Sequence, residues 1–454
     1  MTRLNATRTT QATRCVGRVL AVALASALAG ASPLWAQTAS DALPDTGNLL
    51  YQMQPGDTLT GLVSRHMQGP DALKQLVQVN RFPNVNRIAV GSKIKIPRSL
   101  LKHTPATATV SRLNCKTVIQ IDGNATTPIK TGTVLGEGAV LRIPAGCQFA
   151  LTLEDESTLR LMSGAVIQIK TLRRNSLETS PEVKVELLDG RMEIDVPKKR
   201  RTGDAPFEVL TPTSVAGVRG TEFRVGFDAK QRTSQVEVKV GVVGTRGEQE
   251  TSEKRTGAGH GVAITASGQS LDVEKLLSPP RYASVEPQAG GKDLLLKFDA
   301  AAQAERFLLI TAEDANFSAL VSQTQPTQAQ VLAPDLGTKP VFYQWSSIAP
   351  SGLMGQAQDY AICKGYKRQE HWRCNVPFNT LGLIKPHLLF QKVDAQGQVF
   401  ELLNGPIQAV DNNLLVFRGL PSGVYRWRIE HEVSASMTAG INGQFELVAI
   451  PGAD

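Results

Sequence analysis

The side chains that most often carry out chemistry are sparse in this 454-residue chain and form no recognisable catalytic motif. Its six His occur without the H-E-x-x-H or H-x-x-E-H spacing that places two imidazoles on one zinc ion. No Ser stands in a G-x-S-x-G turn, and no isolated pair of acids forms a motif for general acid–base catalysis. We therefore expect a protein that is not an enzyme and that uses neither a metal nor a cofactor.

Cysteine is the one reactive side chain with informative spacing. Of the five Cys, Cys15 lies near the N-terminus, and the other four are Cys115, Cys147, Cys363 and Cys374. In an oxidising compartment an even number predicts disulfides. Of the three possible pairings we favour Cys115–Cys147 with Cys363–Cys374, because each pair then falls within one expected domain. A metal site is the alternative, but neither a C-x-x-C motif nor a nearby pair of His supports it.

The first residues predict export. Four Arg precede an apolar run over residues 19–29, and the phrase S-P-L-W-A at 32–36 follows with a small residue at the expected cleavage point. This pattern is typical of a secretory signal peptide over residues 1–36, cleaved after about Ala36. The run is shorter than the roughly 20 residues of a membrane-spanning helix. An uncleaved anchor is the alternative; otherwise no integral membrane segment remains after cleavage.

The charge argues against a nucleic-acid partner. The formal net charge of +8 falls to 8 − 4 = +4 when the four Arg of the signal are removed, and the remaining charges are scattered. The densest cluster, residues 198–201 with the sequence KKRR, is expected to be a solvated loop. Binding of an anionic polymer or a membrane by this cluster is the alternative.

Residues 46–100 predict a small module of the order β-α-α-β. Leu49, Tyr51 and Met53 alternate as in a strand, a Pro-Gly turn follows, and two helical patterns precede a closing strand that ends at Pro97. The phrases Gly-Asp-Thr-Leu at 56–59, Asn80, and Gly91 to Pro97 resemble the LysM domain. Members of that family bind glycans that contain N-acetylglucosamine, chiefly peptidoglycan.

The resemblance implies a shallow glycan-binding groove between two loops. Its walls would be formed by Gly56, Asp57, Thr58 and Leu59 on one side and by Val85, Asn86, Arg87 and Ile88 on the other. The alternative is structural, since Asp and Thr also cap helices and Asn80 would then only cap a turn.

Residues 101–112 predict a linker, and residues 113–275 predict an all-β domain. Short strands with one apolar face follow one another there with almost no helical period, which favours a sandwich or an open β roll. Asp189-Gly190 stands between two alternating runs, and this predicts a two-residue hairpin.

The centre of this domain is the stretch Thr211–Val225, which predicts strand, tight bend and strand. Its phrase V-R-G-T-E-F resembles the signature of the FecR domain, a β-rich extracytoplasmic module of bacteria, over roughly residues 131–265. The signature residues are Val218, Arg219, Gly220, Thr221, Glu222 and Phe223. We expect Arg219 and Glu222 to form an ion pair that fixes the bend, and a contact with a partner is the alternative. Founders of that family pass a signal from an outer-membrane transporter to a sigma factor.

Residues 281–362 and 376–450 predict two β-sandwich repeats. The phrases Tyr343–Trp345 and Tyr425–Trp427 are 427 − 345 = 82 residues apart, near the length of one small sandwich. The phrase P-x-G-x-Y-x-W-R-I resembles the penultimate strand of fibronectin type III-like domains, more clearly in the second copy than in the first. Both Trp are expected in the core, and sugar stacking is the alternative.

Together these features predict a multidomain, mainly β protein of the periplasm. We expect peptidoglycan and an envelope protein as partners, with the first module as anchor and the FecR-like domain as the protein contact. The alternatives are a cell-wall hydrolase or its accessory, and a FecR-type regulator of envelope signalling.

Overall fold

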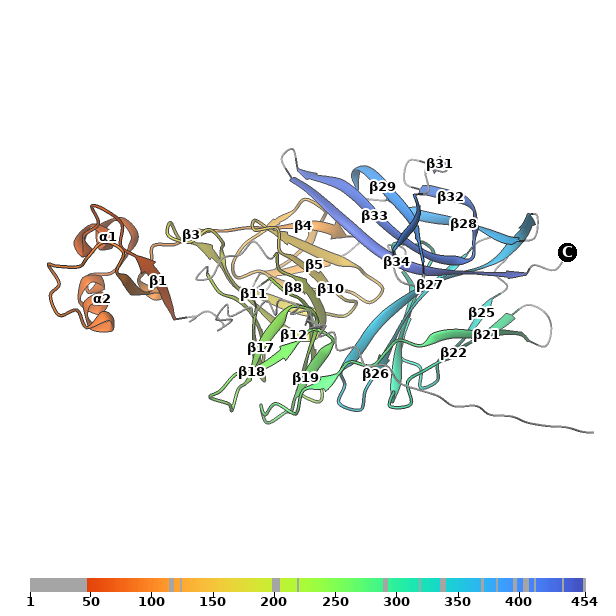
Figure 1. Ribbon diagram of the computed structural model, residues 1–454, viewed down its shortest axis with the longest axis horizontal. Helices are drawn as coiled ribbons and strands as arrows, with labels where there is room; N and C mark the ends of the chain where they lie inside the picture. Colours follow the sequence, from red (N-terminus) through yellow and green to blue (C-terminus); the bar gives the residue numbers. More distant parts are fainter. Residues whose placement is uncertain are drawn as a thin grey trace, which may run out of the picture. The chain divides into compact units, whose positions relative to one another are not determined.

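The computed structural model describes residues 47–113, 118–122, 125–197, 205–218, 220–288, 293–317, 320–334, 340–368, 371–380, 383–394, 398–402, 408–411, 414–434 and 437–451. Strands dominate these residues, as the sequence predicts, and Figure 1 shows them along the chain. None of the helices within these ranges is long and apolar enough to cross a membrane. The signal peptide, Cys115, Arg219 and the basic cluster 198–201 lie outside the described residues.

The first module has the predicted order of elements: β1 (Asn48–Gln52), α1 (Leu59–His66), α2 (Ala72–Asn80) and β2 (Lys93–Pro97). The two strands pair antiparallel, with Leu49 opposite Ile96. Apolar residues spaced for one helical face, such as Leu62 and Leu76, are fully buried against this pair. A short 3-10 helix over Arg98–Leu100 leads into the next domain.

The FecR-like region is a closed β structure with one apolar core. Its strands are β3 (Thr104–Pro105), β4 (Ala108–Leu113), β5 (Val118–Asp122), β6 (Ala125–Ile129), β7 (Val134–Leu135), β8 (Val140–Arg142), β9 (Phe149–Leu153), β10 (Thr158–Leu161), β11 (Val166–Arg174), β12 (Glu182–Asp195), β13 (Phe207–Thr211), β14 (Ser214–Val218), β15 (Glu222–Asp228), β16 (Thr233–Val240), β17 (Val242–Gly247), β18 (Lys254–Gly257), β19 (His260–Ile264) and β20 (Glu274–Lys275). The structure differs from the expected linker at 101–112, because β4 pairs with β9 and Val110 is fully buried. Its alternating Ala and Val supply an apolar face that the core covers.

The expected hairpin at Asp189-Gly190 is wrong, because β12 runs straight through it. Before Gly190 the strand pairs with β11 and β13, and after Gly190 it pairs with β10 and β15 in a second sheet. Gly190 has φ +85, and a Cβ there would lie 2.8 Å from the Cα of Ala165. The glycine therefore lets one strand change sheets at a close backbone contact rather than turn back.

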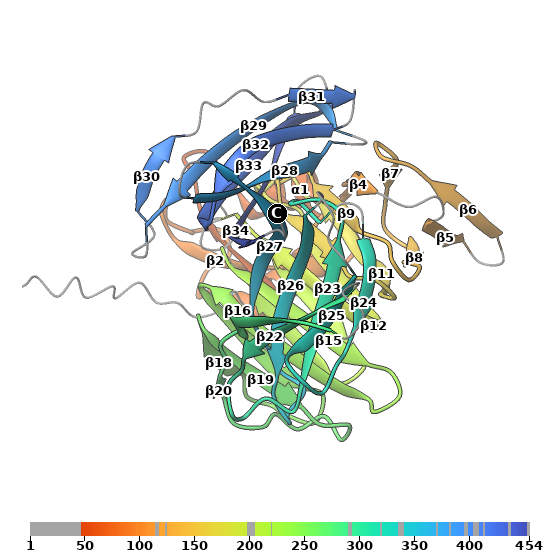
Figure 2. The ribbon, with the colours of Figure 1, turned by 90° about the vertical axis from the view of Figure 1, so that its right-hand side faces the viewer.

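The C-terminal region holds the strands β21 (Arg281–Pro287), β22 (Asp293–Asp299), β23 (Arg306–Ala312), β24 (Leu320–Thr324), β25 (Gln330–Pro334), β26 (Val341–Ile348), β27 (Met354–Arg368), β28 (His371–Asn379), β29 (Ile384–Val393), β30 (Val399–Leu402), β31 (Gln408–Asp411), β32 (Leu414–Pro421), β33 (Gly423–Ser434) and β34 (Met437–Pro451). A parallel pairing of β27 with β34 joins the two expected repeats into one large sheet (Figure 2). The expected core residues Trp345 and Trp427 are buried, which confirms their predicted place.

The disulfide Cys363–Cys374 is confirmed. It joins β27 to β28, and both Cys are buried in the core that surrounds Trp427. Cys147 is also disulfide-bonded, as expected.

Candidate functional site

The first loop of the expected glycan groove is held by one carboxylate. Asp57 accepts hydrogen bonds from the Tyr51 hydroxyl at 2.6 Å, the Gln54 amide at 2.9 Å and the Arg65 guanidinium at 3.0 Å. These donors, Tyr51 first, hold the pKa of Asp57 below its usual range, so the group stays ionised at neutral pH. Burial and the Asp57 carboxylate together raise the pKa of Tyr51 to about 12. Gly56 precedes this carboxylate with φ +86, a conformation that favours glycine.

Two further residues of the expected site have structural contacts. Thr58 is the N-cap of α1, since its hydroxyl accepts from the Gly61 amide at 3.0 Å, and Leu59 is buried in the module core. Asn80 joins α2 to β2: its amide nitrogen donates to the carbonyls of Leu76 and Lys95, and its oxygen accepts from the Lys95 amide at 2.7 Å. Capping and bracing therefore account for these side chains.

The second loop lies beside the first. Met53, after β1, exchanges backbone hydrogen bonds with Gly91 and Ser92 before β2, at 2.8 and 3.0 Å. The side chains of Val85 and Val90 are exposed here by 44% and 64%. Asn86 and Arg87 are exposed as well, and the half-buried Ile88 packs on the module core. These bonds join the two loops at their bases beside the sheet, and the expected groove between Gly56–Leu59 and Val85–Ile88 stays a prediction.

The signature bend is a crossing from one sheet to the other. Val218 ends β14, which pairs with β13 and β17, whereas Phe223 begins the buried part of β15, which pairs with β12 and β16. Gly220 has φ +59 between them, and Thr221 is buried. The strand, bend and strand predicted from the sequence are confirmed, and the bend does not form a hairpin.

A second crossing packs against the signature. The chain returns to the first sheet between β16 and β17 at Gly241, whose φ is +88 and whose missing Cβ would meet the Thr221 side chain at 2.6 Å. Glu222, half-buried, lies 3.4 Å from Lys239. Since Arg219 is outside the described residues, the expected Arg219–Glu222 pair stays a prediction.

A row of charged residues crosses the sheet beside this bend. Glu193, Arg224 and Glu237 lie opposite one another on β12, β15 and β16. Arg224 is 2% exposed and donates to Glu193 at 3.2 Å, and Lys239 donates to the same carboxylate at 2.9 Å. Burial alone would raise the pKa of Glu193, but Lys239, Arg224 and Arg160 hold it well below its usual range.

This charged row binds the backbone of the C-terminal region. Arg224 donates to the carbonyl of Met354 at 3.3 Å, and Glu237 accepts from the Met354 amide at 2.9 Å. Arg191 joins Glu237 to the carbonyl of Gly352, both at 2.8 Å. The row therefore recognises main-chain groups of another segment. Sequence reasoning missed it, although charged residues at alternating positions of three neighbouring strands were a signal.

The first module also docks on the FecR-like region through an ion pair. The Arg98 guanidinium lies 2.7 Å from Glu178, and both side chains are almost completely buried. His66 lies 2.7 Å from the Ser176 hydroxyl, and Leu177 packs on the module core. Within the described ranges, three or more His, Cys, Asp or Glu never gather as a metal site would require.

Comparison with known proteins supports the central domain. Residues 139–244 match the family described as FecR protein. These residues include the charged row and all six residues of the signature, of which the structure describes five. No curated protein matches the chain.

Two crystal structures of a "putative anti-sigma factor" from Parabacteroides distasonis, at 2.50 and 1.65 Å resolution, are each 23% identical to this chain. Each match covers 30% of this chain, with a TM-score of 0.25. The chain spans 59% of the length of those structures. From the family match, residues 139–244 of this chain form a FecR domain.

Proposed function

We propose that this chain is a non-enzymatic regulator of the bacterial envelope that acts on a protein partner through its FecR domain. The observation that carries this proposal is the FecR match over residues 139–244, on strands that already bind the backbone of another segment. It supports a regulatory function better than the passive peptidoglycan-bound scaffold that the sequence favours. Export to the periplasm is part of the proposal.

The surface that we assign to the partner lies at the second crossing of the FecR domain. Val240 and Val242 flank Gly241 and are exposed by 42% and 40%. They stand beside the signature, because Gly241 packs on Gly220 and Thr221. Exposed apolar side chains at a rigid corner suit a protein contact, since burying each one removes apolar area from water.

Site-specific photo-crosslinking in cells tests this surface. A crosslinker at position 240 or 242 should give an adduct with an envelope protein, and one at Val134 should not. Val134 is the control because it is a still more exposed Val of the same region, 59% exposed on β7. Equal adducts from all three positions, or none from 240 and 242, would argue against the assignment.

Measuring the transcript levels of envelope genes distinguishes a regulatory function from a scaffold function. Deleting the gene should change the transcript level of a defined set of envelope genes, and the wild-type chain should restore it. Val240→Asp should not restore it, because a buried charge at the contact is costly. Val134→Asp should. Unchanged transcripts after deletion would refute the regulatory function.

A second function, peptidoglycan binding by the first module, rests on a separate observation. The two loops expected to form the groove adjoin through Met53, Gly91 and Ser92. Val85→Asp should remove co-sedimentation of the full chain with purified peptidoglycan. Leu50→Asp should keep it, because Leu50 is similarly exposed on β1, away from both loops. Equal co-sedimentation of the two variants with peptidoglycan would refute glycan binding at this groove.

A further inference from the structure

A polar cavity lies between the FecR domain and the C-terminal sheet. Its volume is about 470 Å³, within the range of roughly 300–1,000 Å³ that small-molecule sites occupy. The FecR-like region lines one side with strands β4, β9, β10, β12, β15 and β16, and the C-terminal region lines the other with β23, β24, β26, β27, β33 and β34. Ligand sites are common at such junctions.

The FecR wall of this cavity carries one weakly paired cation. Arg224 at 3.2 Å and Lys239 at 2.9 Å both contact the Oε1 atom of Glu193, which leaves Oε2 to Arg160. Arg160 reaches the same carboxylate only at 3.6 Å, and its side chain remains 48% exposed. Asp195 also lines this wall, and burial followed by the charge of Glu222 raises its pKa. Arg112 lines this wall too, but it donates to the carbonyl of Asn316 at 3.0 Å, so the exposed Arg160 is the cation here that is best placed to receive an anionic group.

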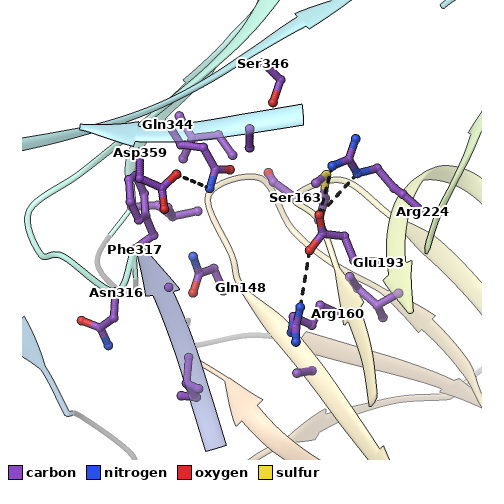
Figure 3. A pocket seen from close by; sticks show the side chains of 18 of the residues that line it. Gln148, Arg160, Ser163, Glu193, Arg224, Asn316, Phe317, Gln344, Ser346 and Asp359 are labelled. Atoms are coloured by element: carbon purple, nitrogen blue, oxygen red, sulfur yellow. Dashed lines mark hydrogen bonds and ion pairs between the residues drawn. The ribbon is translucent and has the colours of Figure 1, made fainter. Parts of the chain in front are cut away.

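The opposite wall carries a carboxyl group without a cation. Asp359 on β27 accepts one hydrogen bond, from the amide of Gln344 on β26 at 2.8 Å. Among the residues that the structure describes, Asp359 has no ion-pair partner within 4.0 Å. Burial raises its pKa to about 7; the negative charge of Glu193 adds to the shift, and Gln344 and Lys239 oppose it. Figure 3 shows Asp359 and Gln344 on one side of the cavity and Arg160 and Glu193 on the other, with Gln148 between them.

We propose that this cavity binds a small zwitterion, a free amino acid or short peptide, with its ammonium group on Asp359 and its carboxylate on Arg160. A carboxyl group without a counter-ion gains most from a ligand ammonium, because the two charges meet in a site shielded from water. A ligand with anionic groups alone would leave Asp359 without a cation and would bring another negative charge close to it. The amide side chains of Gln358, Asn442 and Gln444 also line the cavity and suit the peptide groups between the two ends.

A bound zwitterion would affect the contact that strand β15, which carries the end of the signature, makes with the C-terminal region. Glu193 and Arg224 line the cavity, and Arg224 also holds the backbone of Met354. Occupancy would thus stabilise the contact between the FecR domain and the C-terminal region by mass action, because only the joined form presents both charges. This inference does not depend on which protein the FecR domain contacts.

Calorimetric titration of the full chain with the dipeptide alanyl-alanine tests the proposal. We expect saturable binding of one dipeptide per chain. Two analogues each lack one charge: the N-acetylated dipeptide has no ammonium group, and the dipeptide amide has no carboxylate. Each should bind at least about tenfold more weakly, the change in Kd that 1.4 kcal/mol produces. Lack of saturable binding, or equal binding of all three compounds, would overturn the proposal.

Two variants locate the charges, and each has a matched control. Asp359→Asn should weaken dipeptide binding and abolish the preference for a free ammonium over the acetylated form. Arg160→Gln should abolish the preference for the carboxylate over the amide. The controls Asp272→Asn and Arg255→Gln make the same changes at exposed positions of the FecR-like region. Far-UV circular dichroism checks that each variant is folded. Folded cavity variants that keep both preferences would place the ligand elsewhere and refute the assignment.

Discussion

Gly241→Ala should destabilise the FecR domain strongly, because the new Cβ atom would be placed on a strained backbone and would also be overpacked. The residue has φ +88, where an alanine is disfavoured by about 1–2 kcal/mol. The new Cβ would also lie 2.6 Å from the Thr221 methyl group and 3.2 Å from the carbonyl oxygen of Gly220. Overpacking of this kind costs about 1–3 kcal/mol. The expected loss of unfolding free energy is therefore about 2–5 kcal/mol.

Alanine substitutions at Gly259 and Gly257 measure the cost of the backbone conformation apart from the cost of overpacking. Gly259 has φ +75 with no atom near its missing Cβ, so Gly259→Ala should lose only the conformational part, about 1–2 kcal/mol. Gly257 has ordinary φ and open space. Gly257→Ala should leave stability within about 0.5 kcal/mol or raise it slightly, since alanine restricts the unfolded chain.

Hydrogen exchange in increasing urea, followed by mass spectrometry of peptides that cover residues 220–245, measures the effect where it arises. Tryptophan fluorescence alone would miss it, because Trp345, Trp372 and Trp427 all lie in the C-terminal region. If Gly241→Ala loses no more stability than Gly259→Ala, the two crossings are not closely packed. The account of the V-R-G-T-E-F bend as a packed corner would then be refuted.

Three further changes test other contacts. Arg98→Ala leaves the buried Glu178 without its cation and should cost about 3–5 kcal/mol, measured as faster hydrogen exchange in residues 47–101 and 175–180. The pKa of Asp359 is raised to about 7, so the folded state holds a proton that the unfolded state releases near pH 4. Wild-type stability should therefore fall as pH rises from about 4 to about 7, and urea unfolding of Asp359→Asn should lack this part of the fall. Replacing Cys363 and Cys374 together by Ala opens a loop of 11 residues and should lower stability by about 2–4 kcal/mol in thermal unfolding under oxidising conditions.

Local sequence signals predicted the elements of the fold well. These signals are the cap at Thr58, the helical spacing of Leu62 and Leu76, and the alternation in the strands. Each acts within a few residues, so it can be recognised from the sequence. The order β-α-α-β, the mainly β architecture and the bend in Thr211–Val225 followed from them. The disulfide Cys363–Cys374 followed from the even number of Cys and from the expectation that each pair falls within one domain.

The pairing of strands that are far apart in the sequence could not be predicted. Asp189-Gly190 has the composition of a hairpin, yet the neighbouring Ala165 backbone and the partners β10 and β15 hold it in a straight strand that changes sheets. The polar segment before β4 has the composition of a linker, but its alternating small residues pack under β9. Composition cannot distinguish a glycine that turns a chain from one that lets two backbones approach.

The buried charged row bears on the proposed regulatory function, because it lies at the contact between the FecR domain and the C-terminal region. An apolar interface of the same size would leave a face that aggregates once it opens. Arg224 and Glu237 instead bond to the main chain of Met354, and Arg224 also has Glu193 as an ion-pair partner on its own domain. Beside this row Leu353 packs on Ala263 in a small apolar cluster, so the contact also includes buried apolar area. Because ion pairs in the interior return little net free energy after desolvation, the charged row itself adds little to the stability of the contact. Under the proposed function, a ligand in the adjoining cavity or a protein at the corner of Val240 and Val242 would shift the arrangement of the domains only by as much as its affinity differs between two arrangements.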